Sequence, residues 1–345
     1  MTPTDPPPHP GRPALAPLVD ERGVVVVCGT GGVGKTTTSA ALALAAARRG
    51  RRVVVVTIDP ARRLADALGI GALGNTPRLV DGVGPGRLGA MMLDTKSTFD
   101  ELVRRHARDD TQAERILSNP FYRNISSGLS GTQDYMAVEK LNELHTSGEW
   151  DLVVVDTPPS RDALAFLDAP RLLTRLLDNP VYKVLTAPNR GLLRAVNHAA
   201  QSLVRQLSRV VGAEIVDEAV AFFQAFEGME DGFRARAEAT LRLLGDTRTA
   251  FVLVASPRPD VTAESRWFAR RLNEAGIEVA ALVVNRLLPP VTSDPATAHR
   301  VADLLAPSTL AATAAALAEH AGAVAVERER VAELATWAPA APLIG

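Results

Sequence analysis

The sequence predicts an α/β fold, a doubly wound parallel sheet with an inserted helical subdomain. Short apolar runs rich in valine recur at 24–27, 53–56, 152–155, 250–254 and 279–284. Runs of this length without polar alternation are typical of parallel strands that are buried on both faces. Helical sequence lies beside each run, so strands and helices alternate. The 345 residues, 46% of them hydrophobic, suffice for one large domain and exclude a disordered protein.

Residues 1–20 are predicted to form a disordered, proline-rich tail. Their composition is unlike the apolar core of a secretory signal. No charge-free run of about 18 apolar residues follows, because the alanine-rich stretch near 309–326 contains Glu319 and His320 and reads as helical. We therefore expect a cytoplasmic protein, with peripheral membrane binding as a further possibility.

The remainder, 21–345, is predicted to be a single α/β domain with a helical insert. Two long segments, approximately 97–147 and 161–246, lack strand-like runs and carry Leu, Ala, Phe and Val at helical spacings. We interpret them as one helical subdomain that enters the sheet in two pieces. The chain has no internal repeat, so any twofold arrangement requires a second chain.

A Walker A motif follows the first valine-rich run. The sequence GTGGVGKT matches GxxxxGK[ST], with a strand before it and helical sequence after it. Its glycines let backbone N–H groups surround phosphates at the positive end of a helix dipole. Lys35 is expected to reach the β- and γ-phosphates, and the Thr36 hydroxyl to hold Mg²⁺. The sheet is therefore predicted to be of the P-loop NTPase type. The nucleotide-binding candidates here are Gly29, Thr30, Gly31, Gly32, Val33, Gly34, Lys35, Thr36 and Thr37.

Two aspartates are predicted at the carboxyl ends of parallel strands, where ligands bind in this architecture. Asp59 follows the run 53–56, and Asp156 follows the run 152–155. A single Asp after a strand is more often a helix cap. Two such aspartates downstream of a phosphate loop favour a role in the nucleotide site over helix capping. One is expected to orient or deprotonate the attacking water and the other to complete the magnesium shell, so both are metal-ligand candidates beside Thr36.

The chain resembles the arsenite-efflux ATPase and the guided-entry ATPase that targets tail-anchored proteins. Four motifs occur in order: the phosphate loop, 59–66, 156–159 with 163–167, and 283–285. The resemblance runs from about Val24 to Asn285, and the partitioning and septum-site ATPases are more distant cousins. It implies that Asp59 is the catalytic carboxylate of the first switch, that Asp156 opens the second switch, and that Asn285 recognises adenine. Lys35 of the Walker A motif is the other catalytic candidate.

The chain departs from this family at several positions. The family's lysine one residue after the first loop glycine, which reaches the nucleotide of the partner, is Thr30 here. A glutamate that holds the nucleotide aligns with Arg258, which takes its place as a candidate. Two copies of this chain could not exchange the lysine. We therefore consider a homodimer and a heterodimer with a paralogous ATPase that keeps it.

The cysteine count limits the function within the family. Cys28 is the only cysteine of the chain, which rules out an internal disulfide, a CxxC zinc site and an iron–sulfur site with four cysteines. Arsenite efflux relies on a cysteine metalloid site, so we do not expect it. The 38 Lys and Arg residues balance 39 Asp and Glu residues, and this net charge of -1 gives no indication of a nucleic-acid partner.

The later part of the helical insert offers candidates for a client or membrane surface. Residues 179–213 lack Asp and Glu and carry four arginines on a segment with an apolar helical face. Such a segment can bind an anionic membrane or an acidic partner, although it can also be a solvated face. Nearby phenylalanines could line a groove for an apolar client helix, or belong to the core. The candidates are Arg190, Arg194, Arg205, Arg209, Phe222, Phe223 and Phe226.

We expect a Mg²⁺-dependent ATPase with ATP and Mg²⁺ as cofactors. Its nucleotide state is expected to control dimer conformation and the binding of an apolar client or membrane-associated partner. The alternative is a nucleotide-gated binding or chaperone module with negligible turnover. A DNA-partitioning ATPase is disfavoured by the neutral charge and by the large helical insert.

Overall fold

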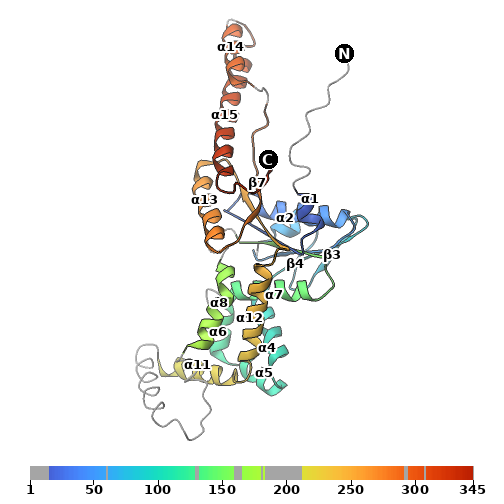
Figure 1. Ribbon diagram of the computed structural model, residues 1–345, viewed down its shortest axis with the longest axis vertical. Helices are drawn as coiled ribbons and strands as arrows, with labels where there is room; N and C mark the ends of the chain where they lie inside the picture. Colours follow the sequence, from blue (N-terminus) through green and yellow to red (C-terminus); the bar gives the residue numbers. More distant parts are fainter. Residues whose placement is uncertain are drawn as a thin grey trace.

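The structure is a computed structural model that describes residues 15–59, 61–128, 132–158, 165–179, 182, 212–290, 294–306 and 308–344. Over these residues eight strands form one sheet in the order β3-β4-β2-β5-β1-β6-β7-β8 (Figure 1). The strands are β1 Val24–Gly29, β2 Arg52–Thr57, β3 Arg78–Val80, β4 Arg87–Met92, β5 Leu152–Asp156, β6 Thr249–Ala255, β7 Val279–Val284 and β8 Leu343–Ile344. All neighbouring strands are parallel except β3 and β4. The predicted α/β fold is therefore confirmed.

The five predicted strands are β1, β2, β5, β6 and β7, and they form the centre of the sheet. Successive valines of β1 face opposite sides: Val25 and Val27 pack in one apolar cluster, whereas Val24 and Val26 pack in the other. All four are fully buried. Helices cover both faces, which explains why these strands are apolar throughout instead of alternating.

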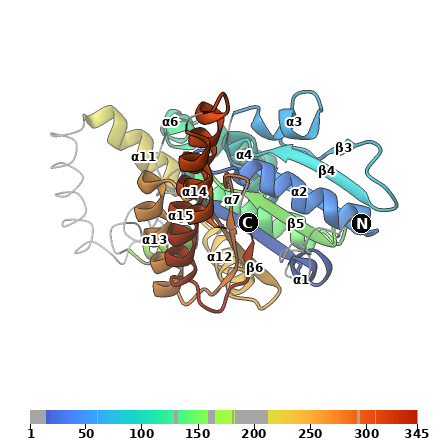
Figure 2. The ribbon, with the colours of Figure 1, turned by 90° about the horizontal axis from the view of Figure 1, so that it is seen from above.

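One face of the sheet is covered by α2, Lys35–Arg48, which packs against β1, β2, β4 and β5. Figure 2 shows it running alongside β5, with α3, Arg63–Leu68, near β3 and β4. A short helix, α1, Ala16–Asp20, packs against α2 through buried Leu18 and Val19. The expected tail of residues 1–20 is therefore too long. Its last five residues form a helix because two apolar side chains find a place in the core.

The two predicted helical segments form a group of helices at one end of the sheet (Figure 1). Side-chain caps begin two of them, because Asp94 accepts a hydrogen bond from the Ser97 amide and Asp109 from the Gln112 amide. The helices are α4 Thr95–His106, α5 Asp110–Leu117, α6 Pro120–Gly128, α7 Thr132–Thr146, α8 Ala165–Asp178, α11 Ala213–Ala225 and α12 Glu230–Leu244.

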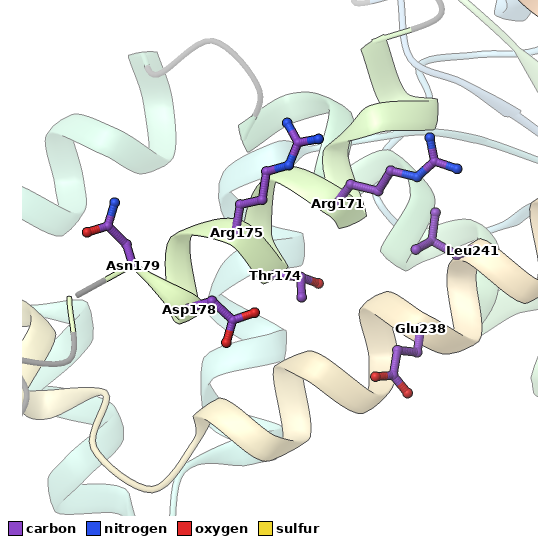
Figure 3. A pocket seen from close by; sticks show the side chains of 7 residues that line it. All are labelled: Arg171, Thr174, Arg175, Asp178, Asn179, Glu238 and Leu241. Carbon is purple, nitrogen blue, oxygen red and sulfur yellow. The ribbon is translucent and has the colours of Figure 1, made fainter. Parts of the chain in front are cut away.

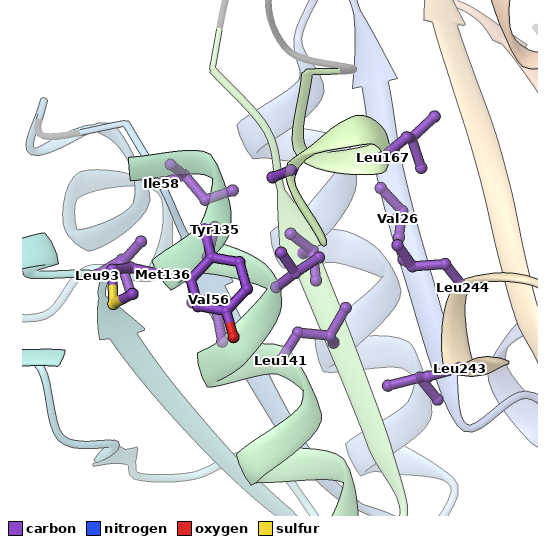
Figure 4. Close-up of a cluster of buried hydrophobic side chains, with 14 of the residues drawn as sticks. Val26, Val56, Ile58, Leu93, Tyr135, Met136, Leu141, Leu167, Leu243 and Leu244 are labelled. Atoms are coloured by element: carbon purple, nitrogen blue, oxygen red, sulfur yellow. The ribbon is translucent and has the colours of Figure 1, made fainter. Parts of the chain in front are cut away.

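The apolar core continues from the sheet into this helical group. Figure 4 shows Tyr135 of α7 near Val56 of β2, and Leu167 and Leu244 near Val26 of β1. The same cluster contains side chains of α8 and of the end of α12, so the helices are anchored on the sheet face opposite α2.

Three helices complete the C-terminal part. The first, α13, Pro259–Glu274, packs against β1, β6 and β7. The other two, α14, Pro295–Leu305, and α15, Ala311–Ala335, pack against each other as a hairpin. This hairpin projects from the sheet at the end away from the helical group (Figure 1). The alanine-rich stretch near 309–326 is therefore helical, as predicted.

Candidate nucleotide-binding site

The phosphate loop joins β1 to α2 and depends on glycine at two points of close approach. Gly29 has a φ of 145°, and a Cβ there would lie 2.1 Å from the backbone oxygen of Val254. Gly34, the residue before α2, has a φ of 101°, and its Cβ would lie 2.3 Å from the Asn285 amide nitrogen. Both positions exclude any side chain. The loop therefore has the backbone that phosphate binding requires, directly before a helix N-terminus.

Lys35 points back into the loop. Its Nζ donates a hydrogen bond to the backbone oxygen of Thr30 over 2.8 Å, and the side chain is buried. Burial lowers the pKa of Lys35, and the nearby Asp156 carboxylate opposes that shift. The loop thus holds a cation where β- and γ-phosphates would lie.

Thr30 occupies the position of the family's exchanged lysine. Its side chain is 2% exposed, and its hydroxyl has no hydrogen-bond partner among the described residues. A short, buried side chain cannot extend to a second chain. This fits the expectation that the chain lacks the exchanged contact.

Asp156 lies at the centre of the site because the register of the sheet brings three strand ends together. It pairs with Val27 of β1 and with Thr57 of β2. Its Oδ2 accepts hydrogen bonds from the Thr36 hydroxyl over 2.9 Å and from the Thr57 hydroxyl over 3.0 Å. Its Oδ1 is buried without a partner in the described part of the chain. Burial raises the pKa of Asp156, against the effect of these two hydrogen bonds.

This arrangement fits a hard divalent cation. A hydroxyl and a carboxylate are oxygen ligands of the kind that Mg²⁺ prefers. The Thr36 hydroxyl and the Asp156 carboxylate lie 2.9 Å apart, and one carboxylate oxygen has no donor within the described part of the chain. No group of three or more His, Cys, Asp or Glu that could hold a metal is present among the described residues. A Mg²⁺ ion here would therefore need the nucleotide and water for its remaining ligands.

Asp59 follows β2 and is held by its own loop. One carboxylate oxygen accepts a hydrogen bond from the Ala61 amide over 3.0 Å, and the other accepts one from Arg63 over 2.9 Å. The side chain is 13% exposed. The motif 59–66 contains Arg63, but the sequence alone indicates no role for it. Its spacing of four residues from Asp59, across the start of α3, is the signal for this ion pair.

Asn285 follows β7 and contacts the phosphate loop. The side-chain Nδ2 of Asn285 donates a hydrogen bond to the backbone oxygen of Val33 over 2.9 Å. Its backbone N–H donates to the backbone oxygen of Ala255, at the end of β6. Arg258 follows β6, but its guanidinium pairs with Asp260 of the same helix over 2.7 Å. The structure therefore joins Asn285, but not the side chain of Arg258, to the phosphate loop.

A cavity of about 420 Å³ lies along α2, after the phosphate loop. It is lined by Thr37, Thr38 and Ala41 of α2, by the end of β7 including Asn285, and by α1 with the residue before it. Its mostly apolar wall with a few polar groups is typical of a small-molecule pocket. The sequence does not predict the contribution of α1, because residues 16–20 belong to the expected tail.

The candidates in the helical group have different outcomes. Phe222 is 3% exposed, and its ring lies 4.7 Å from that of Phe226 and 5.3 Å from that of Phe223. Phe222 belongs to the apolar core, whereas Phe223 and Phe226 are partly buried and pack against it. Arg190, Arg194, Arg205 and Arg209 lie outside the described residues.

A second cavity, of about 440 Å³, lies between α8 and α12. Figure 3 shows Arg171 and Arg175 on α8, with Glu238 and Leu241 on the facing helix. The lining also includes Asp178, so the two arginines are balanced by two carboxylates. This mixed charge favours neither an anionic nor a cationic ligand.

None of the described helices combines the length and apolarity that a membrane span requires.

Comparison with known proteins identifies the family. The family profile described as "Anion-transporting ATPase" matches residues 22–303. The ATPase GET3 of Malassezia globosa is 27% identical over 280 residues, 81% of this chain and 77% of that protein. The ATPase GET3 of Phaeosphaeria nodorum is 26% identical over 82% of this chain and 83% of its own. The chain therefore belongs to the anion-transporting ATPase family and is an ATP-hydrolysing P-loop enzyme.

Proposed function

We propose that the chain hydrolyses ATP in a Mg²⁺-dependent manner and uses the nucleotide cycle to control a dimer and an apolar client. The observation that carries the proposal is the buried Asp156 carboxylate. One of its oxygens accepts a hydrogen bond from the Thr36 hydroxyl, and the other has no donor among the described residues. A buried charge with an unused oxygen is costly unless a cation or a donor completes it. Bound nucleotide and metal would do so.

Thr36 and Asp156 would hold Mg²⁺, directly or through water, and the ion would neutralise charge on the β- and γ-phosphates. The chain's own residues would do the rest. Backbone amides of the loop and the Lys35 ammonium would bind and orient the phosphates. Asp59 would accept a hydrogen bond from the attacking water once its Arg63 partner is displaced. Asn285 and the cavity beside α2 would receive the nucleoside.

The helical group would carry the response to the nucleotide. The Gln133 side chain, near the start of α7, donates to the Ile58 backbone oxygen, next to Asp59, over 3.3 Å. A change at Asp59 would therefore reach α7 directly. We infer that an apolar client, or a membrane-associated partner, binds this helical group. The protein would act in the cytoplasm, with peripheral contact at a membrane.

The threonine at position 30 affects which second chain could complete the nucleotide site. Because its buried side chain cannot supply the exchanged lysine, a paralogous ATPase that keeps the lysine could complete the site in a heterodimer. A homodimer would use two sites without that contact. Mixing the chain with such a paralogue would raise ATP turnover above that of either chain alone if the heterodimer is the active form.

A second candidate function is a nucleotide-gated binder with negligible turnover. The Asp59–Arg63 ion pair favours it, because both carboxylate oxygens of Asp59 are engaged by the chain itself. In this form ATP binding alone would switch the helical group, and the client would be held stoichiometrically.

Steady-state ATP hydrolysis with Mg²⁺ separates the two functions. We expect Lys35→Ala and Asp59→Asn each to lower turnover at least about 100-fold, because one removes phosphate charge stabilisation and the other the orientation of water. ATP binding should survive in Asp59→Asn. Tight ATP binding by the unmodified chain with no measurable turnover would instead identify the gated binder.

A further inference from the structure

Arg63 is the first residue of α3, and its side chain lies against the catalytic candidate Asp59. Its Nη1 donates a hydrogen bond to Oδ2 of Asp59 over 2.9 Å, while Oδ1 accepts one from the Ala61 amide. The Arg63 side chain is 61% exposed, whereas the next residue, Leu64, is buried in the core. The start of α3 is therefore anchored, and the long arginine side chain has room to turn.

A chain of hydrogen bonds joins this ion pair to the centre of the nucleotide site. The backbone N–H of Asp59 donates to the Thr57 hydroxyl over 3.2 Å. That hydroxyl donates to Oδ2 of Asp156 over 3.0 Å, and the same oxygen accepts a hydrogen bond from Thr36. Arg63 is thus attached, through Asp59, to the strand ends that surround the expected position of the phosphates.

The charge of Arg63 also acts on the phosphate loop. Burial lowers the pKa of Lys35, Asp156 and Asp59 oppose this shift, and Arg63 adds to it. This repulsion places the guanidinium within electrostatic reach of the Lys35 ammonium, although the two side chains come from different elements. Two cations that face one site are an arrangement that a bound polyphosphate would stabilise.

The ion pair between Arg63 and Asp59 is one that a phosphate can displace. Pairs with an exposed partner contribute little to stability, because water screens the attraction and the long side chain loses freedom. A guanidinium binds a phosphate through two parallel hydrogen bonds, and a terminal phosphate carries more charge than a carboxylate. Arg63 should therefore prefer the γ-phosphate of a triphosphate held by the loop.

We propose that Arg63 is a catalytic residue that leaves Asp59 when ATP binds and contacts the γ-phosphate in the site of its own chain. This inference rests on the proposed ATP hydrolysis and adds a second cation to Lys35. The same movement frees Oδ2 of Asp59 for the attacking water, while the Ala61 amide still holds the other carboxylate oxygen. ADP has no γ-phosphate, so Arg63 returns to Asp59 after phosphate release.

The task of Arg63 follows from the charges that change during hydrolysis. The water oxygen forms a bond to the γ-phosphorus, and the bond from phosphorus to the bridging oxygen breaks with its electron pair going to ADP. The water proton passes to Asp59 and then to solvent. Negative charge is spread over the γ-phosphoryl oxygens in the transition state, and a guanidinium placed there stabilises it. Thr30, which is uncharged and buried, supplies no such cation.

Nucleotide binding by the full chain with Mg²⁺ tests the contact without any turnover. The probes are ADP and a non-hydrolysable ATP analogue, each titrated by calorimetry. Arg63→Gln should raise the Kd of the analogue at least about 10-fold and leave the Kd of ADP within about twofold, because ADP lacks the phosphate that Arg63 contacts. Arg62→Gln is the matched control, since it removes the neighbouring exposed arginine, and it should change neither Kd.

Turnover gives a second measurement. Arg63→Gln should lower kcat at least about 100-fold, because the γ-phosphoryl charge loses its arginine. Arg63→Lys should recover part of both losses, since an ammonium keeps the charge but not the planar fork. Thermal unfolding without nucleotide should be the same for all variants, because the ion pair that they remove is exposed on the arginine side.

Three results would overturn the role of Arg63. Faster turnover in Arg63→Gln would mean that the arginine only masks Asp59. Equal weakening of ADP and the analogue would assign Arg63 to the shape of the loop, and no weakening of either would exclude the contact. If the unmodified chain binds ATP without hydrolysing it, the proposed enzyme fails, and the comparison of the two nucleotides still decides whether Arg63 contacts the γ-phosphate.

Discussion

At the scale of single residues, Asp156 combines a structural cost with a binding role. Its carboxylate is fully buried, and burial raises its pKa above the ordinary value. The charged form is therefore less favourable in the folded protein than in the unfolded chain. The folded state thus loses stability as pH rises through the carboxylate range and regains it as pH falls.

We expect Asp156→Asn to stabilise the nucleotide-free protein at neutral pH by about 1 kcal/mol, because the amide oxygen can still accept from Thr36 and Thr57 without a buried charge. The gain should disappear at acidic pH, where the native Asp156 is itself protonated. The same variant should lose the stabilisation that ATP gives in the presence of Mg²⁺. Thermal unfolding at several pH values, with and without ATP and Mg²⁺, measures both effects. A variant less stable than the native chain at neutral pH would contradict this account.

At the scale of elements, the helical group contains a buried ion pair that joins two of its helices. Glu139 of α7 is 2% exposed and pairs with Arg236 of α12. The carboxylate lies away from the nucleotide site, close to Tyr135 and His106. This pair fixes α12 relative to α7, since a buried charge must remain near its partner.

Arg236→Met should lower the free energy of unfolding by about 3 kcal/mol, because it leaves the Glu139 carboxylate buried without a cation. Combining it with Glu139→Gln should recover most of the loss, which would separate the charge effect from lost packing. Urea denaturation provides the measurement. As a control, Arg242→Met on the same helix removes an arginine that is 72% exposed and should change stability little. An additive double variant would rule out the charge effect.

The sequence is sufficient to predict the central elements but not those at the edges. The strands β1, β2 and β5 are runs of valine, a pattern that a strand buried on both faces explains. The β4 sequence RLGAMM has no such pattern. Its Gly89 is required because a Cβ there would lie 2.7 Å from the Trp150 ring, a contact between distant segments. The two-residue strand β8 likewise depends on pairing with β7.

The sequence likewise predicts only part of the candidate site. The Walker A motif locates Lys35 and Thr36, and the strand ends locate Asp59 and Asp156, because parallel strands end at one edge. The side-chain contacts of the site residues cannot be predicted from their spacing in the sequence alone. The contact of Asn285 with Val33 and the Asp260 partner of Arg258 depend on how side chains turn after the strands end.

At the scale of the whole molecule, α7 connects the nucleotide site to the helical group within the part of the chain that the structure describes. Gln133 contacts the backbone beside Asp59, Met136 belongs to the apolar cluster that contains Ile58, and Glu139 reaches α12. These residues lie on successive turns of one helix. A rigid helix that touches both regions can transmit a displacement without local unfolding.

We expect Gln133→Ala to retain ATP binding and most turnover, because Gln133 contacts the backbone next to Asp59. It should reduce the change that ATP and Mg²⁺ cause in amide exchange along α7 and α12, by about half or more if this contact is the main coupling. Gln112→Ala is a suitable comparison. That side chain binds the backbone of the Ala225–Glu227 turn, within the helical group and away from the site, so the nucleotide effect should persist. An unchanged response in Gln133→Ala would assign the coupling to the segment after Asp156 instead of to α7.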